Sequence, residues 1–220
     1  MEDALPRIEF DFPGLPPGIS GRVSVCLVSV LCASDEEWIR NHYIHDDDTR
    51  SLATRIRHPH RLSESVLARV AKAELLRRFG GDPAIVNFSF SHTRNEHVVI
   101  AAAAMSKESV GLDLELLDRL DGRERLQDRL LVGQESERLR EISPSQRALP
   151  ALKLWCAKES LAKAMGTGLQ APLEQYEAQL RSGPDSCLEA EFLRFPQWYS
   201  TIMVHRETVL SICLPRETPS

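Results

Sequence analysis

Two long helical patterns, one in each half of the chain, most constrain what it can fold into. Residues 63–81, SESVLARVAKAELLRRFGG, combine strong helix formers with apolar residues around most of the circumference and end in two glycines. Residues 151–169, ALKLWCAKESLAKAMGTGL, follow Pro150 and reach Gly166, a typical start and stop for a helix. The first helix has so wide an apolar surface that we expect it to pack against more than one neighbour.

Strand patterns accompany both helices. The predicted strands cover residues 22–31, 84–92, 97–105, 109–117, 187–195, 198–205 and 208–214. We therefore predict an α+β fold of two pseudo-symmetric lobes, each a small, mostly antiparallel sheet with a packed long helix. The N-terminal lobe would span residues 1–105, with an irregular Pro-rich start at 1–20, and the C-terminal lobe residues 106–220. A further helix is predicted after Ser34, which forms a capping-box-like pair with Glu37.

The net charge and the composition of the chain limit which partners we expect it to bind and in which compartment we expect it. The formal net charge of −5 does not favour long-range attraction to nucleic acid or to an anionic membrane. The longest apolar run, residues 23–33, is too short to span a bilayer, and the N-terminus lacks the pattern of a signal peptide. The five cysteines form no C-x-x-C pair, which favours small core residues in a reduced setting. We expect a cytoplasmic protein with no nucleic-acid or membrane partner.

The segment VGLDLELLDR, residues 110–119, places two carboxylates on one face of a predicted strand. Asp113 and Glu115 alternate with apolar residues, so their backbone positions lie about 6.6–7 Å apart. Two carboxylates at that distance repel each other, and partial burial increases the cost. This face could simply be exposed to solvent. Alternatively, it could bind Mg²⁺, which prefers carboxylate oxygens and keeps positions for water or substrate phosphates.

Two other segments carry polar residues with more than one interpretation. Glu159 and Lys163 lie four residues apart on one face of the second helix, where a surface ion pair is the simplest interpretation. His92 ends the strand pattern of FSFSHTRN, residues 88–95. It could bond to backbone there, or act as a cation or donor for a phosphate.

The order of these motifs along the chain is specific, although each one is weak alone. An S-H pair is followed by G-x-D-x-E and then by W-x-x-K-E-x-x-x-K-x-x-G-x-G. The residues of these motifs are Ser91, His92, Gly111, Asp113, Glu115, Trp155, Lys158, Glu159, Lys163, Gly166, Gly168 and Leu169. This arrangement resembles the 4′-phosphopantetheinyl transferases of the two-lobed, monomeric, surfactin-synthetase-activating type.

The resemblance implies a reaction and a cofactor. Asp113, Glu115 and Glu159 would form a Mg²⁺ site that also holds the pyrophosphate of coenzyme A. A serine hydroxyl of an apo acyl or peptidyl carrier protein would attack the β-phosphate, so that phosphopantetheine is transferred and 3′,5′-ADP leaves. Such a transfer mostly requires positioning and neutralisation of developing charge.

The resemblance also suggests roles for single residues. Glu159 is the candidate base for the carrier serine, and Asp113, Lys163 and His92 complete the expected catalytic set. Arg61 and Arg69 are candidates for the nucleotide phosphates, because arginine can bind phosphate bidentately. The expected contacts to coenzyme A are Ser91, His92, Lys163, Arg69 and Arg61.

The segment between the two carboxylate motifs is rich in arginine. Residues 119–140 interleave arginines with acidic residues, a pattern that fits either a solvated helix face or a patch for docking an acidic carrier protein. The resemblance implies that the C-terminal lobe carries the metal site and the carrier-docking surface, and that the N-terminal lobe lies on the side where coenzyme A binds. We expect a monomer.

Two alternatives to an active transferase stay open. One is a Mg²⁺-dependent phosphohydrolase or nuclease, which the acidic balance and the lack of a basic or aromatic nucleic-acid face disfavour. The other is a non-catalytic relative that binds carrier protein or coenzyme A. The chain lacks the lysine that these transferases usually carry before the S-H strand, which favours that second alternative; the retained carboxylates and Lys163 disfavour it.

Overall fold

The computed structural model describes most of the chain. The described residues are 7–10, 15–31, 51, 55, 56, 58–80, 82, 85–170, 172–183, 185 and 187–217, with Leu31, Pro59 and Glu124 described by their backbone alone. The helix predicted after Ser34 lies outside these residues. No helix among the described residues is both long enough and apolar enough to cross a bilayer.

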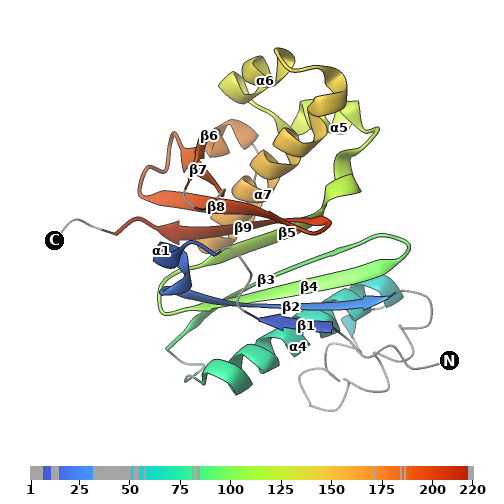
Figure 1. Ribbon diagram of the computed structural model, residues 1–220, viewed down its shortest axis with the longest axis vertical. Helices are drawn as coiled ribbons and strands as arrows, with labels where there is room; N and C mark the ends of the chain where they lie inside the picture. Colours follow the sequence, from blue (N-terminus) through green and yellow to red (C-terminus); the bar gives the residue numbers. More distant parts are fainter. Residues whose placement is uncertain are drawn as a thin grey trace.

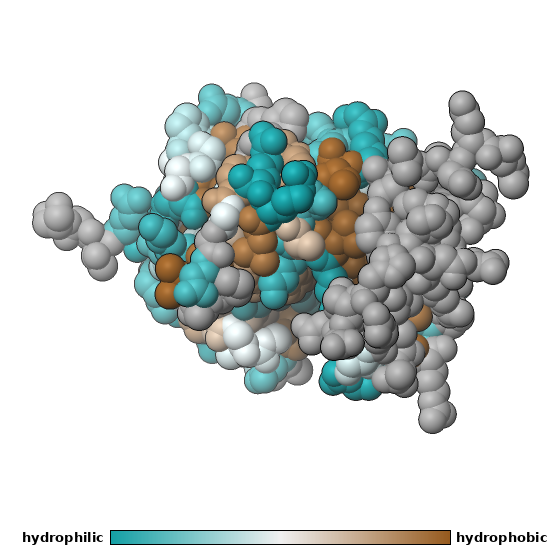
Figure 2. Space-filling model, turned by 90° about the horizontal axis from the view of Figure 1, so that it is seen from below, coloured by the Kyte–Doolittle hydropathy of each residue, from teal (hydrophilic) through white to brown (hydrophobic). Residues whose placement is uncertain are grey.

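The first sheet is antiparallel, and one long helix covers one of its faces. Its four strands follow the order β1 (Arg7–Phe10), β2 (Val23–Leu31), β4 (Val98–Ser106) and β3 (Asn87–Arg94). Helix α4 (Pro59–Phe79) packs against β2, β3 and β4, as the wide apolar surface of its sequence predicts. The face of the molecule seen from the α4 side carries many hydrophilic residues with hydrophobic ones between them (Figure 2). The short helix α1 (Pro17–Ser20) precedes β2.

The second sheet has the same plan with a longer insertion. Its five antiparallel strands follow the order β5 (Gly111–Leu116), β9 (Thr208–Pro215), β8 (Trp198–His205), β7 (Leu188–Phe192) and β6 (Ala178–Ser182). Helix α7 (Ala148–Ala164) packs against β5, β8 and β9. The remaining elements are η1 (Leu117–Leu120), α5 (Glu124–Leu130), α6 (Gly133–Arg140), η2 (Pro144–Gln146) and η3 (Leu173–Tyr176).

The two sheets lie against each other with a long helix on each outer side (Figure 1). Three apolar clusters match this layering. One joins α4 to the first sheet, one joins α7 to the second sheet, and the third lies between the sheets, where Val25 and Ala102 meet Leu112 and Ile212. The fold is therefore α+β with two lobes, as predicted from the sequence.

Some predicted elements need correction. The start of the chain, expected to be irregular, contains strand β1 and helix α1. The pattern in β1 is too short to recognise alone, and its pairing with β2 is what fixes it. Strand β6 was not predicted either, because its polar residues follow no apolar alternation and it lies at the sheet edge. The described cysteines, Cys26, Cys156, Cys187 and Cys213, are buried, as expected for small core residues.

Candidate active site

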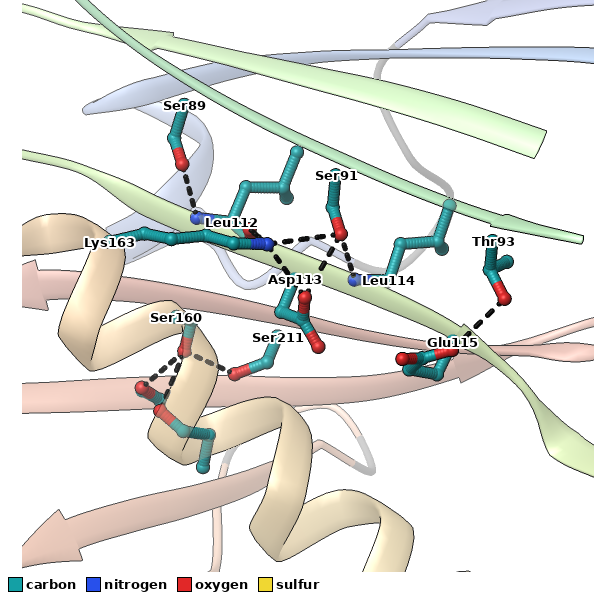
Figure 3. Close-up of polar contacts among 12 residues, drawn as sticks. Ser89, Ser91, Thr93, Leu112, Asp113, Leu114, Glu115, Ser160, Lys163 and Ser211 are labelled. Atoms are coloured by element: carbon teal, nitrogen blue, oxygen red, sulfur yellow. Dashed lines mark hydrogen bonds and ion pairs between the residues drawn. The ribbon is translucent and has the colours of Figure 1, made fainter. Parts of the chain in front are cut away.

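The candidate site forms where the two lobes meet, along the edge strands β3 and β5. Each of these strands ends its own sheet, and they lie side by side (Figure 1). Strand β3 turns Ser89, Ser91 and Thr93 inward, as its strict alternation of buried and less buried residues shows. These hydroxyls reach the free edge of β5, the strand that carries Asp113 and Glu115 (Figure 3).

Asp113 lies at the centre of a buried polar cluster. Its Oδ1 atom accepts a hydrogen bond from Ser91 Oγ at 2.9 Å and a charged one from Lys163 Nζ at 2.7 Å. Lys163 also donates to the carbonyl of Leu112 and to Ser91 Oγ, and its side chain is 28% exposed against 6% for Asp113. The ion pair therefore joins helix α7 to strand β5 at a partly shielded position, where it is stronger than at an open surface.

Gly111 allows α7 to come this close to β5. A Cβ atom at this position would overlap the carbonyl of Ser160 and lie 2.6 Å from the backbone nitrogen of Ala164. Below the same contact, Ser160 Oγ makes hydrogen bonds with the hydroxyls of Ser200 and Ser211. The glycine of the G-x-D-x-E motif thus permits the helix contact that brings Lys163 to Asp113.

The carboxylates of Glu115 and Glu159 resist ionisation. Burial, followed by the negative charge of Asp113, raises the pKa of Glu115 to about 7, although the side chain accepts a hydrogen bond from Thr93 Oγ1 at 3.0 Å. Burial also raises the pKa of Glu159, again with Asp113 as the second cause and Lys163 opposing it. Asp113 thus lies near enough to both Glu115 and Glu159 to affect their ionisation, as the segment spacing predicted for Glu115.

A cavity of about 710 Å³ adjoins this cluster on the first-lobe side. Its lining is rich in basic residues from both lobes and includes two carboxylates. The lining residues are Arg55, Ile56, His58, Arg61, Glu64, Ser65, His92, Thr93, Arg94, Glu115 and Arg119. Arginine and histidine in such numbers favour an anionic ligand, and arginine in particular fits phosphate oxygens.

His92 connects the cavity to the cluster. Its Nδ1 atom lies 3.3 Å from Glu64 Oε2, and its side chain is 43% exposed. Burial lowers the pKa of His92, while the nearby Glu64 carboxylate opposes that shift. A lowered pKa favours the neutral imidazole at pH 7, which serves a ligand as a hydrogen-bond partner rather than as a cation.

The structure brings most of the predicted site residues together, with different surroundings for some. Arg61, His92 and Glu115 line the cavity, while Asp113, Glu159 and Lys163 lie beside it and do not line it. Arg69 does not line this cavity, and its guanidinium donates to the carbonyl of Ser65 on the same helix. Four further basic residues were not singled out for this site from the sequence: Arg55, His58, Arg94 and Arg119.

The oxygen atoms of the expected ligands suit Mg²⁺ chemically. The ligands are not, however, arranged as a metal site in this structure. Asp113 Oδ2 is buried and makes no hydrogen bond of good geometry with a described residue, although the Cys156 thiol lies close to the Asp113 carboxylate. Its neighbours Glu115 and Glu159 lack enough positive charge around them to lower their pKa values. Within the described ranges no three His, Cys, Asp or Glu residues are grouped as a metal site, and Asp113 Oδ1 contacts Lys163 instead. The donor set is nevertheless the all-oxygen kind that Mg²⁺ prefers.

A second, wholly buried ion pair supports α7 from behind. Lys158 Nζ lies 2.6 Å from Glu135 Oε2 and also donates to the carbonyl of Leu130. Glu135 in turn accepts hydrogen bonds from the backbone nitrogens of Val132 and Ala178. The sequence motif W-x-x-K-E therefore contains one structural residue, Lys158, next to one site residue, Glu159. No spacing rule in the sequence reveals the partner Glu135.

A comparison with protein families matches the part of the chain that carries most of these carboxylates. The family model of the 4′-phosphopantetheinyl transferase superfamily matches residues 109–213. This range contains β5 with Asp113 and Glu115, and α7 with Glu159 and Lys163. The two lobes meet at carboxylates beside a cavity with a basic lining, an arrangement that suits an anionic ligand. This match, over slightly less than half of the chain, supports assigning residues 109–213 to the superfamily. No curated protein matches the chain.

The raised pKa of Glu115 leads to a prediction about stability. Since the folded protein binds this proton more tightly than the unfolded chain, stability falls as pH rises from about 4.5 to about 7. We expect Glu115→Gln to increase the free energy of unfolding at pH 8 by about 1–3 kcal/mol, because glutamine keeps the Thr93 contact without the buried charge. Urea unfolding at pH 8 and pH 5 tests this. The difference should nearly vanish at pH 5, and an equally stable variant at pH 8 would contradict it.

Proposed function

We propose that this protein transfers the 4′-phosphopantetheine group of coenzyme A to a serine of an apo acyl or peptidyl carrier protein and releases 3′,5′-ADP. The single observation that carries the proposal is the junction of the lobes. There a carboxylate and lysine cluster, within the part matched to the superfamily, adjoins a cavity with basic lining from both lobes. A substrate with separate phosphate groups needs this combination.

The basic cavity is the proposed seat of the nucleotide half of coenzyme A. Arg61 comes from α4, Arg94 from β3 and Arg119 from η1, so the guanidinium groups approach the cavity from different elements. Such groups can bind phosphate oxygens bidentately and do not lose their charge. His92 would add a neutral hydrogen-bond partner on the side that faces Asp113.

The residues beside the cavity would act on the reacting phosphate and on the carrier serine. Asp113, Glu115 and Glu159 are the proposed holders of Mg²⁺, which when bound would offset the charge that develops on the pyrophosphate. Lys163 donates to Asp113, Ser91 and the carbonyl of Leu112, which use its three ammonium protons, so its proposed contact to a phosphate oxygen would replace one of these hydrogen bonds.

Glu159 is the proposed general base. Burial raises the pKa of its carboxyl toward neutrality, and a carboxylate with a raised pKa accepts a proton more readily. It would take the proton of the carrier serine as the hydroxyl oxygen bonds to phosphorus and the bond from the β-phosphorus to the oxygen of 3′,5′-ADP breaks.

The carrier protein is proposed to dock on the helical insertion that follows β5. The arginines of this insertion are exposed and come from η1, α5, α6 and the turn between η1 and α5. They are Arg119, Arg123, Arg125, Arg129, Arg138 and Arg140. These side chains could attract an acidic carrier even though the whole chain is negatively charged. The two lobes provide all parts of the proposed site, so a monomer suffices.

Product analysis separates this proposal from its two alternatives. The protein is mixed with coenzyme A, an apo carrier protein and Mg²⁺, and nucleotides are separated by chromatography. A transferase releases 3′,5′-ADP only when the carrier is present. Release of nucleotide fragments from DNA in a parallel reaction would favour a nuclease. Coenzyme A that stays bound to the protein without forming product would identify a non-catalytic binder.

A further inference from the structure

Three hydroxyl groups of β3 complete the hydrogen bonding of β5. Strand β5 pairs with β9 on one side, so the backbone nitrogens that point away from β9 need other partners. The nitrogen of Leu112 donates to Ser89 Oγ at 2.8 Å, that of Leu114 to Ser91 Oγ at 3.1 Å, and that of Leu116 to Thr93 Oγ1 at 3.4 Å. We call Ser89, Ser91 and Thr93 the hydroxyl ladder.

Two members of the hydroxyl ladder also hold carboxylates. Ser91 donates to Asp113 Oδ1 at 2.9 Å, and Thr93 donates to Glu115 Oε2 at 3.0 Å (Figure 3). In the described part of the chain, Ser89 makes no hydrogen bond to a carboxylate. Ser91 and Thr93 thus each contact both the β5 backbone and a carboxylate, whereas Ser89 contacts the β5 backbone and, among the described residues, no carboxylate.

This pattern fixes the direction of the hydroxyl protons of Ser91 and Thr93. A serine or threonine hydroxyl has one proton and two acceptor positions. In Ser91 both acceptor positions are used, by the nitrogen of Leu114 and by Lys163, and the proton goes to Asp113. Ser91 is also 6% exposed. It therefore has no remaining group for a substrate phosphate, the role that the family resemblance suggested.

We propose that Ser91 and Thr93 are positioning residues, which orient Asp113 and Glu115 from the opposite lobe so that the two carboxylates can bind a divalent cation. This inference rests on the cation site of the proposed function. The backbone contact of each hydroxyl sets its place along β5, and its proton then holds one oxygen of the neighbouring carboxylate. Partners that orient metal ligands in this way commonly change metal affinity by about 10- to 100-fold when they are removed.

The test uses matched variants and a probe that does not depend on transfer. Thr93→Val removes the hydroxyl with little change of shape, and Thr93→Ser keeps the hydroxyl. Ser89→Ala is the control, because it removes a ladder hydroxyl that contacts no carboxylate. Binding of Mn²⁺ alone to each protein is measured from the electron paramagnetic resonance signal of the free ion, and urea unfolding of each variant is measured alongside.

We expect the Kd for Mn²⁺ to increase about 10-fold in Thr93→Val and to return to the wild-type value in Thr93→Ser. Ser89→Ala should keep the wild-type Kd even if its stability falls as much as that of Thr93→Val. Equal Mn²⁺ affinity in Thr93→Val and wild type would overturn the inference, and so would an equal loss in Ser89→Ala, which would make the ladder merely structural.

The two proposals can fail separately. A wild-type protein that transfers phosphopantetheine, with unchanged Mn²⁺ affinity in Thr93→Val, contradicts the positioning role alone. A wild-type protein that binds Mn²⁺ in a Thr93-dependent way but transfers nothing contradicts the proposed function and leaves the positioning role standing. If the wild-type protein binds no Mn²⁺, the positioning role is wrong, since there is no cation for the carboxylates to hold.

Discussion

Asp113→Asn should reduce the rate of phosphopantetheine transfer by about 10²–10³-fold, the usual cost of removing one preorganised electrostatic group from an active site. Asp113 is the residue through which the cluster is connected, because it contacts Lys163 and Ser91 and raises the pKa values of Glu115 and Glu159. Asparagine keeps the shape but removes the negative charge, which weakens cation binding and removes the ion pair with Lys163. Initial rates of carrier modification measure the effect.

The control for this variant is Glu96→Gln, which removes a carboxylate that is 84% exposed in the turn between β3 and β4. It should transfer at the wild-type rate. Thermal unfolding shows whether Asp113→Asn remains folded, which we expect because Lys163 keeps the carbonyl of Leu112 and Ser91 as partners. A folded Asp113→Asn protein with near-normal rates would remove Asp113 from the proposed site.

Lys158→Met should lower the free energy of unfolding by about 3–5 kcal/mol, the range found when one partner of a buried ion pair is removed. Both partners are shielded from solvent, with the Lys158 side chain 0% and the Glu135 side chain 1% exposed. Methionine fills a similar volume, so the loss comes from the charge of Glu135, which then keeps only the backbone nitrogens of Val132 and Ala178 as partners. Urea unfolding measures the difference.

The double variant Lys158→Met/Glu135→Gln tests the cause of that loss. Glutamine is uncharged and can still accept a backbone hydrogen bond, so the double variant should be more stable than Lys158→Met alone. The departure from additivity measures the coupling between the two side chains. If Lys158→Met lost less than about 1 kcal/mol, or if the two substitutions simply added, the buried pair would not be the main support behind α7.

The sequence predicts the architecture well where periodicity is strong. The helices at α4 and α7 and the strands β2, β3, β4, β5, β7, β8 and β9 correspond to clear apolar patterns. Strand β1 and strand β6 are short or polar, and each is defined by its partner strand rather than by its own residues. Long-range pairing of this kind leaves little trace in the local sequence.

The site, like the fold, could be predicted only in part, because some of its contacts form between residues that are distant in the sequence. Asp113 and Glu115 attract attention because two carboxylates on one strand face are costly, and Glu159 and Lys163 because they share one helix face. The hydroxyls of Ser89 and Thr93 look like ordinary polar residues of an edge strand, and only the approach of β5 gives them partners. Ser91 was expected to face a phosphate and instead lies buried between Asp113 and Lys163.

Charge patterns in the sequence did not reliably predict which basic residues line the cavity. Arg61 and Arg69 both lie on α4, yet only Arg61 lines the cavity. Arg94 and Arg119 reach the same cavity from β3 and η1, which are distant from α4 in sequence. An arginine carries no local signal of the pocket that it faces, so its assignment requires the packing of the two lobes.

Intact-mass spectrometry of an apo acyl carrier protein is the most direct measurement for the proposed transfer. The carrier is incubated with this protein, coenzyme A and Mg²⁺, with and without a chelator. We expect a gain of about 340 Da, the size of one phosphopantetheine group, that disappears with the chelator. No gain on any of several acyl and peptidyl carrier proteins, from a protein shown to be folded, would contradict the proposal that this junction of two lobes is a phosphopantetheinyl transfer site.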